Sequence, residues 1–516
     1  MSLTKAEIVE QIVAKGAQLR SERESASSDG AATLQQLLDL KAQFKALTGA
    51  EYRARSSKSA KRARASAAAQ REAESNRADP SNPDAPSKRR KQPGVSQMWR
   101  EEARAQREQQ SESLMALPPP PSSFPAWSKR DYFRFELLYT SKKPGSRARV
   151  GRIHTPHGVI DTPGFVPVGT NAALKAIDER QAHECGVQLM FCNTYHLLVH
   201  PGPQIVRDAG GLHKYMNHRG PIITDSGGFQ VFSLAAPSAD DAPEMKSRAK
   251  AARAANREGG PANSSSLLCV GERGALFRSY LNGEHIELTP ESSVAAQKDL
   301  ASDIIIPLDE LPPYHISRER LKQSVRLSHR WMARSLRAHL ERPQQQAMYA
   351  VIHGGTDEEL RKESAEYLSS LPFDGFAVGG SLGKDRAEML ELLRFLMPLL
   401  PTDKPNHLLG IADPESAEAV VPFGVDTMDS CNPTRIARHG LLLCTGGNLK
   451  IQQSKHINDY GPIDPQVETI AHSRAYLHHL YKQHEPLYSS LATMHNLIYM
   501  NKHMASIRDR IMKDEI

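Results

Sequence analysis

Long apolar segments and cysteines are both scarce in this sequence, and each scarcity excludes a class of protein. No apolar run approaches the roughly 18 residues that cross a membrane, so a membrane protein is not expected. The N-terminus also lacks the pattern of a secretory signal peptide. The chain has 516 residues and five cysteines, at positions 185, 192, 269, 431 and 444. This odd, scattered set excludes a disulfide framework and indicates a reducing compartment, so we expect a soluble, cytoplasmic protein.

Hydrophobic residues are also few, at 39% of the chain, which predicts that part of its length builds no core. Residues 53–130 fit this description, because Ala, Ser, Arg, Lys, Pro and Glu dominate there without apolar periodicity, and we predict a disordered linker. Residues 53–112 hold 15 Lys or Arg and 8 Asp or Glu, a net charge of +7 that equals the excess of the whole chain. A basic arm beside a neutral body indicates contact with a polyanion. Its SKRRK stretch leaves an RNA-binding arm, a nuclear-targeting signal and a solvated spacer all open.

Residues 1–52 have helical periodicity instead. Ile8, Ile12 and Val13 form one apolar stripe, and several leucines with Phe44 form a second. The turn signal SSDG separates the stripes and Thr-Gly ends the second helix, so we predict an antiparallel helical hairpin. Its stretch LLDLKAQFKALTGAEY resembles the WHEP domain, a hairpin appended to several eukaryotic aminoacyl-tRNA synthetases. The resemblance implies an auxiliary tRNA or protein contact, with a plain coiled-coil hairpin for oligomerisation as the alternative.

From about residue 131 to residue 516 the composition is globular, and short apolar runs recur. Eight of them end in small or polar residues: GFVPVGT, VQLMFCNTYH, PIITDSGG, DIIIPLDE, AMYAVIHGG, FDGFAVGGS, HLLGIAD and VPFGVDTMD. Helical patterns separate several of these runs, and eight alternating strands and helices predict an α/β fold, a (β/α)8 TIM-type barrel. A doubly wound open sheet is the alternative. A polar insert at about 235–274 is expected to be a flexible loop, and a helical C-terminal subdomain is expected after Ala471.

Three aspartates follow predicted strands: Asp225 in TDSGGFQ, Asp309 in PLDELPPY and Asp429 in MDSCNPTR. The carboxyl ends of barrel strands share one rim, so these carboxylates are expected to converge. Exchange at an anomeric carbon with retention needs a carboxylate nucleophile and a second group that handles the proton. A third carboxylate can accept paired N–H donors from a purine-like base. The pattern predicts glycosyl transfer, and a sugar-specific glycosidase stays open.

The stretch GVDTMDSCNPTRIARHG, residues 424–440, adds phosphate-binding groups to this rim. It follows the apolar run VVPFGV, which we predict to be a buried strand, and it contains Asp426 as well as Asp429. Arg435 and Arg438 lie just beyond. A carboxylate at a strand end with two arginines behind it suits a site that attacks a sugar carbon while holding phosphates.

Six motifs occur in order between residues 131 and 516: TDSGGFQVFSL, NTYHLLVHPG, HGGTDEELR, FDGFAVGG, GVD…D-x-x-x-PTR-x-x-R and SRAYLHHL. Together they resemble the tRNA-guanine transglycosylase family. The resemblance implies a pentosyltransferase that exchanges guanine at the wobble position of tRNAs with a G-U-N anticodon for queuine, without an energy cofactor. It further implies a double displacement through a covalent ribosyl-aspartyl intermediate, with Asp429 as the nucleophile and Asp225 as the general acid/base that also binds the base.

The same motifs imply binding roles for other residues. Asp309 is expected to bind the Watson–Crick edge of the base, Phe229 to stack on it, and the Gly380 backbone N–H to reach its carbonyl oxygen. His353 and Ser381 are expected beside them. Contacts with the tRNA are expected from Gly410, Ala412, Asp413, Thr434, Arg435 and Arg438. The expected assembly is a homodimer or a heterodimer with a family paralogue.

Two residues depart from the family pattern within the base site. His353 stands where the family usually has Gln, and although a histidine still offers a donor and an acceptor, it makes the pH dependence of base binding open. Gly383 stands where bacterial members usually carry a bulkier residue. A glycine there opens space for the cyclopentenediol side chain of queuine.

A third departure concerns the family's zinc site. Its C-x-C-x-x-C motif falls on Asp464, Gln466 and Thr469, and of the four ligands only His495 remains, so no metal and no other cofactor is expected. The lost cluster favours a non-catalytic tRNA-binding or partner subunit. The presence of both Asp225 and Asp429 favours an active enzyme, which is the interpretation we adopt.

Overall fold

The computed structural model describes residues 115–230 and 267–516 except Tyr280 and Pro313, together with Gly30–Thr48 and six helical positions between 8 and 18. The chain divides into two compact units, residues 1–91 and 92–516. Most of the predicted linker and residues 235–266 of the predicted insert lie outside the described residues. No helix among the described parts of the chain is long and apolar enough to cross a membrane.

The N-terminal unit contains the helix pair that the sequence predicts. Helix α2 (Gly30–Thr48) ends at the predicted residue, and helical positions between 8 and 18 precede it. Ile8, Ile12 and Leu37 are buried in one apolar cluster, with Phe44 packed against it. The two apolar stripes therefore face each other, as expected for a hairpin. The WHEP resemblance stays a prediction.

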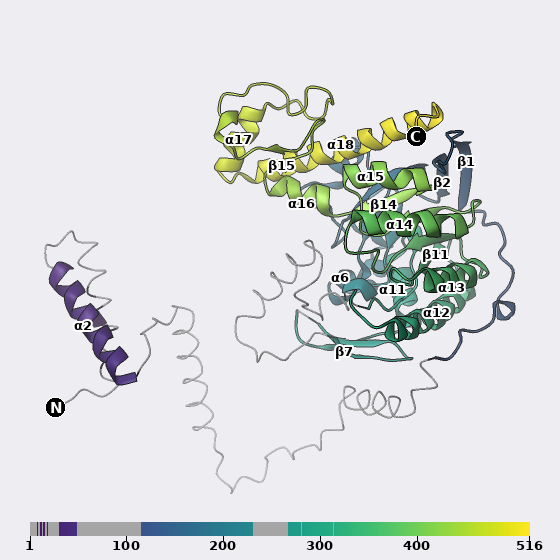
Figure 1. The fold of residues 1–516 in the computed structure, drawn as a ribbon, viewed down its shortest axis with the longest axis horizontal. Helices are drawn as coiled ribbons and strands as arrows, with labels where there is room; N and C mark the ends of the chain where they lie inside the picture. The colour runs from purple at the N-terminus through teal and green to yellow at the C-terminus, as the bar shows by residue number, and fades with distance from the viewer. Residues whose placement is uncertain are drawn as a thin grey trace, which may run out of the picture. The chain divides into compact units, whose positions relative to one another are not determined.

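Eight parallel strands form the central sheet of the second unit (Figure 1). They are β4 (Gly164–Pro167), β5 (Met190–Cys192), β6 (Ile222–Thr224), β10 (Ile304–Ile305), β11 (Ala347–Ile352), β12 (Gly375–Val378), β13 (Asn406–Leu408) and β14 (Thr427–Ser430). Their order is β4-β14-β13-β12-β11-β10-β6-β5, and a parallel bridge between Val168 and Phe191 joins the two ends. The predicted (β/α)8 barrel is confirmed, and closure excludes the open doubly wound sheet.

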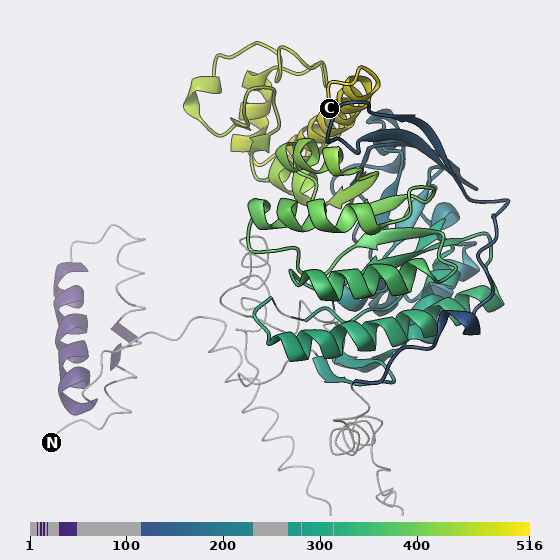
Figure 2. The same ribbon diagram turned by 45° about the vertical axis from the view of Figure 1, so that its right-hand side comes forward.

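Helices surround the barrel. They are α5 (Glu179–Glu184), α6 (Thr194–Val199), α7 (Pro203–Asp208), α8 (Leu212–Tyr215), α11 (Pro290–Leu300), α12 (Arg318–Glu341), α13 (Glu358–Ser369), α14 (Arg386–Leu396), α15 (Pro414–Val420) and α16 (Asn432–Arg438). Figures 1 and 2 show α12, α13 and α14 side by side along the outside. Side-chain caps start them: Ser317, Asp357 and Asp385 each accept a backbone N–H of the first turn.

One predicted strand begins later than the sequence indicates. The run VVPFGV was predicted to be a buried strand, but Val421–Phe423 form a 3₁₀ helix, η3, that ends at Gly424 with φ +90°. Strand β14 starts only at Thr427. An apolar run of this length does not distinguish a strand from a buried helical turn, and the proline and glycine favour the turn.

Two antiparallel sheets that the sequence did not indicate flank the barrel. The first consists of β1 (Arg134–Thr140), β2 (Arg149–Thr155) and β3 (Gly158–Thr162), and the second of β7 (Leu267–Val270), β8 (Ala275–Arg278) and β9 (His285–Leu288). Because β7 pairs with β8, residues 267–270 are an ordered strand and not the end of a flexible insert.

Residues 115–130 also differ from the prediction of a disordered linker, because they lie on the barrel. They include the 3₁₀ helix η1 (Pro121–Ser123). Arg330 of α12 donates to the carbonyl of Ala116 at 2.6 Å, and Trp127 Nε1 donates to Asp374 Oδ1 at 3.0 Å. Each of these hydrogen bonds joins a side chain to a partner far away in the sequence. The spacing of apolar residues along the sequence therefore does not predict them.

The C-terminal subdomain is helical, as predicted. The subdomain contains the two-stranded ribbon β15 (Leu441–Leu442) and β16 (Leu449–Lys450), followed by η4 (Ser454–His456). Helices α17 (Arg474–Lys482) and α18 (Pro486–Met512) complete it. The remaining 3₁₀ helix, η2 (Met397–Leu399), lies in the barrel between α14 and β13. The first half of α18 packs with α17 in a separate apolar cluster that includes Leu477, Tyr488 and Leu491. Its second half contributes Met500 and Ile507 to the barrel core. The helix thus fixes the subdomain to the barrel.

Candidate active site

The predicted site residues gather at the carboxyl ends of the barrel strands. Asp225 directly follows β6, Asp309 follows β10, and His353 follows β11. Gly380 follows β12, and Asp429 lies inside β14. All eight strands are parallel, so these ends share one rim, which is where barrel enzymes place their chemistry.

Asp225 is a buried carboxylate held from three directions. Its Oδ2 accepts from Asn193 Nδ2 at 2.6 Å, and its Oδ1 accepts the backbone N–H groups of Thr194 at 2.8 Å and Gly227 at 3.1 Å. Burial raises the pKa of this carboxyl to about 6, against hydrogen bonds that lower it. A carboxyl group with such a pKa can both give and take a proton near neutral pH, as general acid/base catalysis requires.

Glycine is required in the turn that carries Asp225. Gly227 has φ +82°, and a Cβ there would lie 3.2 Å from the backbone nitrogen of Tyr195. The turn can therefore lie close to the start of α6, whose first backbone N–H, that of Thr194, donates to Asp225. The carboxylate stabilises that helix start, and the helix start in turn fixes the carboxylate.

Among the described residues, only one carboxylate oxygen of Asp429 receives hydrogen bonds. Its Oδ1 accepts the backbone N–H of Gly410 at 2.8 Å and lies 3.1 Å from His407 Nε2, while His407 Nδ1 lies 2.9 Å from Thr427 Oγ1. Among the described residues, no hydrogen-bond donor lies on Oδ2. A strand-borne carboxylate with one oxygen fixed and the other available is suited to attack an electrophilic carbon.

The neighbouring carboxylate, Asp426, has a structural role. It is fully buried, and Arg149 donates to its two oxygens at 2.8 and 2.6 Å. The backbone N–H of Asn406 also donates to it at 2.8 Å. Burial raises the pKa of Asp426, while Arg149 lowers it. This ion pair connects β2 to the barrel.

Asp309 and His353 lie against each other. His353 Nε2 is 2.8 Å from Asp309 Oδ2, a distance typical of an ion pair, but the ring N–H is not aligned for a hydrogen bond. Ser226 Oγ donates to the other oxygen of Asp309 at 3.4 Å. The residue that replaces the family's usual glutamine therefore faces the carboxylate that is expected to read the base.

A buried arginine that the sequence did not single out supports the base site. Arg361 of α13 is fully buried and donates to the carbonyls of Ile352 at 2.6 Å, Gly355 at 2.8 Å, Gly379 at 2.9 Å and Ser381 at 3.0 Å. Burial lowers its pKa to about 9. One guanidinium thus connects the loops that follow β11 and β12, which carry three of the predicted base-binding residues.

A cavity of about 350 Å³ opens between these loops. Its lining includes Tyr314, His353, Gly355, Gly380 and Ser381. Gly380 has φ +77°, and a Cβ there would lie 3.2 Å from His353 Nδ1, so the cavity wall needs glycine at this point. Asp225 and Asp429 do not line the cavity, and Phe229 lies at the rim with 38% of its surface exposed, as a stacking platform requires.

The predicted RNA-binding residues divide into two groups. Arg435 and Arg438 are half-buried on α16, where Arg435 Nη2 donates to Asn432 Oδ1 at 2.9 Å and Arg438 Nη1 donates to the carbonyl of Thr434 at 2.7 Å. Thr434 itself is 2% exposed and donates to Cys431, so it positions the helix start. Arg435 and Arg438 are the two arginines of this helix.

The loop after β13 shows a similar division of roles. The Gly410 N–H orients Asp429, and Ala412 is 1% exposed. Asp413 caps α15 by accepting the N–H of Ser416 at 3.0 Å. The loop is therefore ordered by contacts that also hold the nucleophile.

The four positions of the family's zinc site do not form a zinc site here. His495 Nε2 donates to the carbonyl of Leu443 at 2.7 Å, and its Nδ1 lies 2.6 Å from Thr469 Oγ1. Asp464 accepts the N–H of Thr445 at 2.6 Å. Both imidazole nitrogens already have partners, and the other positions offer a carboxylate, an amide and a hydroxyl in place of thiolates. This donor set does not fit structural zinc.

Fold and rim together define a (β/α)8-barrel enzyme with carboxylates at the carboxyl ends of its strands and arginines beside them. A family model described as "Queuine tRNA-ribosyltransferase" matches residues 144–258 and 256–516. The chain belongs to the queuine tRNA-ribosyltransferase family, the tRNA-guanine transglycosylases.

Individual relatives carry the same description as the family model. "Queuine tRNA-ribosyltransferase" of Protochlamydia amoebophila (strain UWE25) is 56% identical over 388 residues, which are 75% of this chain and 97% of that protein. The protein of the same name from Chlamydia caviae (strain ATCC VR-813 / DSM 19441 / 03DC25 / GPIC) is 49% identical over 387 residues, 74% of this chain and 99% of its own length. The predicted family and enzyme class are confirmed, and the matched region is the barrel with its C-terminal subdomain.

Proposed function

We propose that this enzyme exchanges guanine at the wobble position of tRNAs with a G-U-N anticodon for queuine through a covalent ribosyl-aspartyl intermediate. The observation that carries this proposal is the environment of Asp429, whose Oδ1 is fixed by Gly410 and His407 while Oδ2 faces no donor among the described residues. Asp225, with a pKa of about 6, shares the rim. A fixed nucleophile and a proton carrier are the two groups that a double displacement needs.

The two half-reactions then follow. Asp429 Oδ2 attacks C1′ of the target nucleotide, the C1′–N9 bond breaks with its electrons on guanine, and protonated Asp225 supplies the proton that guanine takes up. After guanine leaves, the incoming base gives a proton to Asp225 and attacks C1′, and the bond from C1′ to Asp429 breaks. Each proton that Asp225 gives in the first step returns in the second, so no cofactor is consumed.

Base binding is assigned to the segments that follow β6, β10, β11 and β12. Asp309 is proposed to accept N–H donors of the base, Phe229 to stack on it, and the Gly380 N–H to meet its carbonyl oxygen. The cavity beside His353 and Ser381 supports this assignment, because it is a concave space next to these groups.

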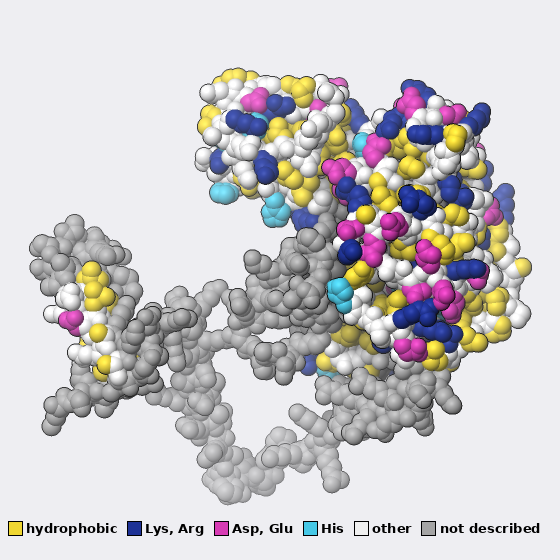
Figure 3. Space-filling view, viewed as in Figure 1, with side chains coloured by type: hydrophobic (Ala, Val, Ile, Leu, Met, Phe, Trp, Pro, Cys, Tyr) yellow, Lys and Arg dark blue, Asp and Glu magenta, His cyan; other side chains and the backbone are white. Residues whose placement is uncertain are grey.

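The RNA is assigned to the rim and α16. On the face that Figure 3 shows, Lys and Arg side chains are interspersed with Asp and Glu. Many are paired, as in Arg318–Asp357 at 2.6 Å and Arg386–Glu415 at 2.8 Å. A neutralised face offers little to a phosphate backbone. Arg435 and Arg438 are assigned to phosphate contacts because they lie on α16, just after the strand that carries Asp429. A cytoplasmic location and a homodimer or paralogue heterodimer complete the proposal.

The Asp429→Asn variant tests the chemistry. With full-length protein, G-U-N tRNA and labelled guanine, the wild type is expected to incorporate label and to form an enzyme–RNA adduct that survives denaturation. Asp429→Asn should lose both while binding tRNA within a few-fold, since the carboxylate forms a bond and does not serve docking. The control Asp403→Asn changes an exposed carboxylate and should behave as wild type.

Two outcomes would contradict the proposal in different ways. An adduct that persists in Asp429→Asn would assign the nucleophile to another residue, with Asp225 the next candidate. Tight tRNA binding by the wild type with neither label nor adduct would identify a non-catalytic tRNA-binding subunit, the alternative that the altered zinc positions favour.

A further inference from the structure

The carboxylate of Asp429 has a buried histidine behind it that the proposed half-reactions do not use. His407 of β13 is fully buried, and its Nε2 lies 3.1 Å from Asp429 Oδ1. The backbone N–H of Gly410 donates to the same oxygen at 2.8 Å. Both groups therefore contact the oxygen that does not form the bond to the substrate.

The strand register explains why one ring reaches Asp429. His407 and Thr427 are direct partners in the parallel pair β13–β14, and Asp429 follows two residues later on the same face of β14. The imidazole spans this interval, because its Nδ1 lies 2.9 Å from Thr427 Oγ1 while its Nε2 reaches the carboxylate. Phe191 of β5 stacks against the ring, with centroids 6.0 Å apart and planes at 23°. The ring is thus held at both nitrogens and on one face.

The position of the hydrogen on His407 follows from the chemistry of its neighbours. An ionised carboxylate only accepts hydrogen bonds, so Nε2 carries the hydrogen and donates to Asp429. The Thr427 hydroxyl can donate or accept, so it is a partner for Nδ1 in either protonation state of the ring. Thr427 is 1% exposed and Asp429 is 6% exposed, so little water can replace these partners. Asp429 Oδ1 therefore accepts two N–H groups.

We propose that His407 is a positioning residue that promotes release of the covalent intermediate, because its N–H stabilises Asp429 more as a free carboxylate than as a ribosyl ester. The inference rests on the proposed function, in which Asp429 forms that ester. In the second half-reaction the incoming base bonds to C1′, the C1′–Oδ2 bond breaks, and its electron pair returns to the carboxylate. Negative charge then spreads to Oδ1, and a hydrogen bond to a charged oxygen is roughly twice as strong as one to a neutral oxygen.

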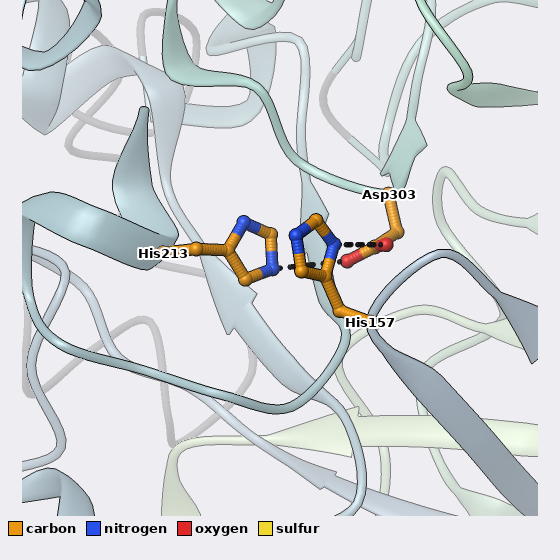
Figure 4. A group of neighbouring side chains, drawn as sticks. All are labelled: His157, His213 and Asp303. Carbon is orange, nitrogen blue, oxygen red and sulfur yellow. Dashed lines mark hydrogen bonds and ion pairs between the residues drawn. The ribbon is translucent and has the colours of Figure 1, made fainter. Parts of the chain in front are cut away.

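A second carboxylate of the same barrel shows how imidazole partners affect a buried anion. Asp303 precedes β10 at the opposite end of the barrel, and Figure 4 shows the rings of His157 and His213 directed at it. His157 Nδ1 is 2.8 Å from Asp303 Oδ1, and His213 Nε2 is 3.2 Å from Asp303 Oδ2. Burial raises the pKa of Asp303, but the two imidazoles and the backbone N–H of Ile222 together outweigh it and lower the pKa to about 2. Imidazole groups thus stabilise the charged form of a buried carboxylate in this protein.

The His407→Phe variant tests the inference, because it keeps an aromatic ring against Phe191 and removes both nitrogens. Full-length wild type and variant are incubated with saturating G-U-N tRNA and a fixed concentration of guanine, and the denaturation-resistant adduct is measured at equilibrium. The ratio of adduct to non-covalent complex should rise about five- to tenfold in the variant, as expected from the difference between a charged and a neutral hydrogen bond. Decay of the adduct after addition of excess guanine should slow, with tRNA affinity within a few-fold.

Two variants of Thr427 test the same contacts without changing the histidine. Thr427→Val removes the hydroxyl partner of Nδ1 and should raise the adduct ratio in the same direction by a smaller factor. Thr427→Ser retains the hydroxyl and should behave as wild type. A role confined to packing predicts the opposite order, because valine is closer to threonine in volume than serine is. These variants keep the test decisive if His407→Phe does not fold.

A control variant and two contrary outcomes complete the experiment. His157→Phe makes the same exchange beside Asp303, away from the rim, and should leave the adduct ratio and its decay unchanged. An equal or lower adduct ratio in His407→Phe and Thr427→Val would overturn the inference and leave the proposed function intact. A wild type that forms no adduct would overturn the proposed function, and this inference with it.

Discussion

At the scale of single residues, burial sets the chemistry of Asp225. Its carboxylate accepts hydrogen bonds from the backbone N–H of Thr194, at the start of α6, and from the side-chain amide of Asn193. Burial raises its pKa to about 6, because the loss of hydration has a larger effect than these hydrogen bonds, which lower the pKa. A carboxyl whose pKa is higher in the folded than in the unfolded protein binds its proton more tightly when folded. It therefore favours folding at low pH, and this contribution is lost as pH rises from about 4 to about 6.

This sign leads to a prediction for Asp225→Asn. Relative to the wild type, the variant should gain stability as pH rises from 4 to 7, by up to about 3 kcal/mol, the equivalent of a two-unit rise in pKa. Exchange activity should be lost at every pH. Urea unfolding of both proteins across this range measures the difference, and a constant difference would show that Asp225 titrates as an ordinary exposed aspartate.

Arg361 shows how one residue can hold a site without touching substrate. Arg361→Ala would leave four loop carbonyls without their donor, so we expect a loss of about 3 kcal/mol or more in unfolding free energy. The Michaelis constant for the base should rise more than the turnover number falls, since the loops after β11 and β12 are proposed to bind the base. Lys362→Ala, on the exposed face of the same helix, is the matched control and should change stability by less than about 0.5 kcal/mol.

At the scale of elements, we propose that packing in the C-terminal subdomain replaces the metal that the family resemblance implies. Ile463 is 1% exposed and shares an apolar cluster with Leu477 and Leu491, next to the positions where the family carries zinc ligands. The two ring nitrogens of His495 form hydrogen bonds with the carbonyl of Leu443 and the hydroxyl of Thr469 in the same region. Burial of this kind stabilises by about 25 cal/mol for each Å² of apolar surface, so a few side chains suffice to fix a loop.

Restoring the cysteines tests this substitution. The triple variant Asp464→Cys, Gln466→Cys and Thr469→Cys should bind one more zinc ion per chain than the wild type, because three thiolates and His495 form a complete tetrahedral set. Elemental analysis of the two proteins, purified side by side, gives the difference directly. Equal zinc contents would mean either that the wild type already binds zinc at this position or that the backbone cannot bring these side chains together.

Sequence patterns were informative for elements with a strong period and uninformative for contacts between distant elements. The eight apolar runs predicted the barrel because each one contains a buried strand, and Asp225 and Asp309 come after theirs. In the last run the apolar part forms η3, and Asp429 lies inside β14. His407 lies within a buried strand, and in the sequence Arg361 looks like an ordinary charged residue of an amphipathic helix. Neither position indicates a role in the site. Only the fold reveals that His407 contacts Asp429 and that Arg361 contacts the loops after β11 and β12.

At the scale of the whole molecule, the contacts that the structure describes on the barrel include residues 115–130, whereas residues 49–114 lie outside the described part of the chain. Residues 115–130 are held on α12 and on Asp374, although the sequence predicted that the linker continues through them. Apolar pattern could not show this, since the contacts are hydrogen bonds between arginines, a tryptophan and distant backbone or carboxylate groups. The removable arm therefore ends near residue 114.

Deleting residues 1–114 should weaken tRNA binding and reduce its salt dependence, with unchanged turnover at saturating tRNA. Each lost phosphate contact is expected to lower the slope of log affinity against log salt by about 0.7–0.9, because neutralised phosphates release counterions. Deleting residues 1–130 should add a loss of stability, because it removes the anchored stretch. If affinity and slope match those of the full-length chain, the arm serves protein contact or targeting.

The position of Asp429 within β14 has a practical consequence for engineering. The strand lies between β4 and β13 in the closed sheet, whereas most of the residues assigned to the base, His353 and Gly380 among them, occupy loops that follow β10, β11 and β12. Mutant libraries confined to those loops can therefore explore new heterocycles while the reactive oxygen keeps its place. Selection for an altered nucleobase should succeed there and fail in libraries that randomise the strand itself.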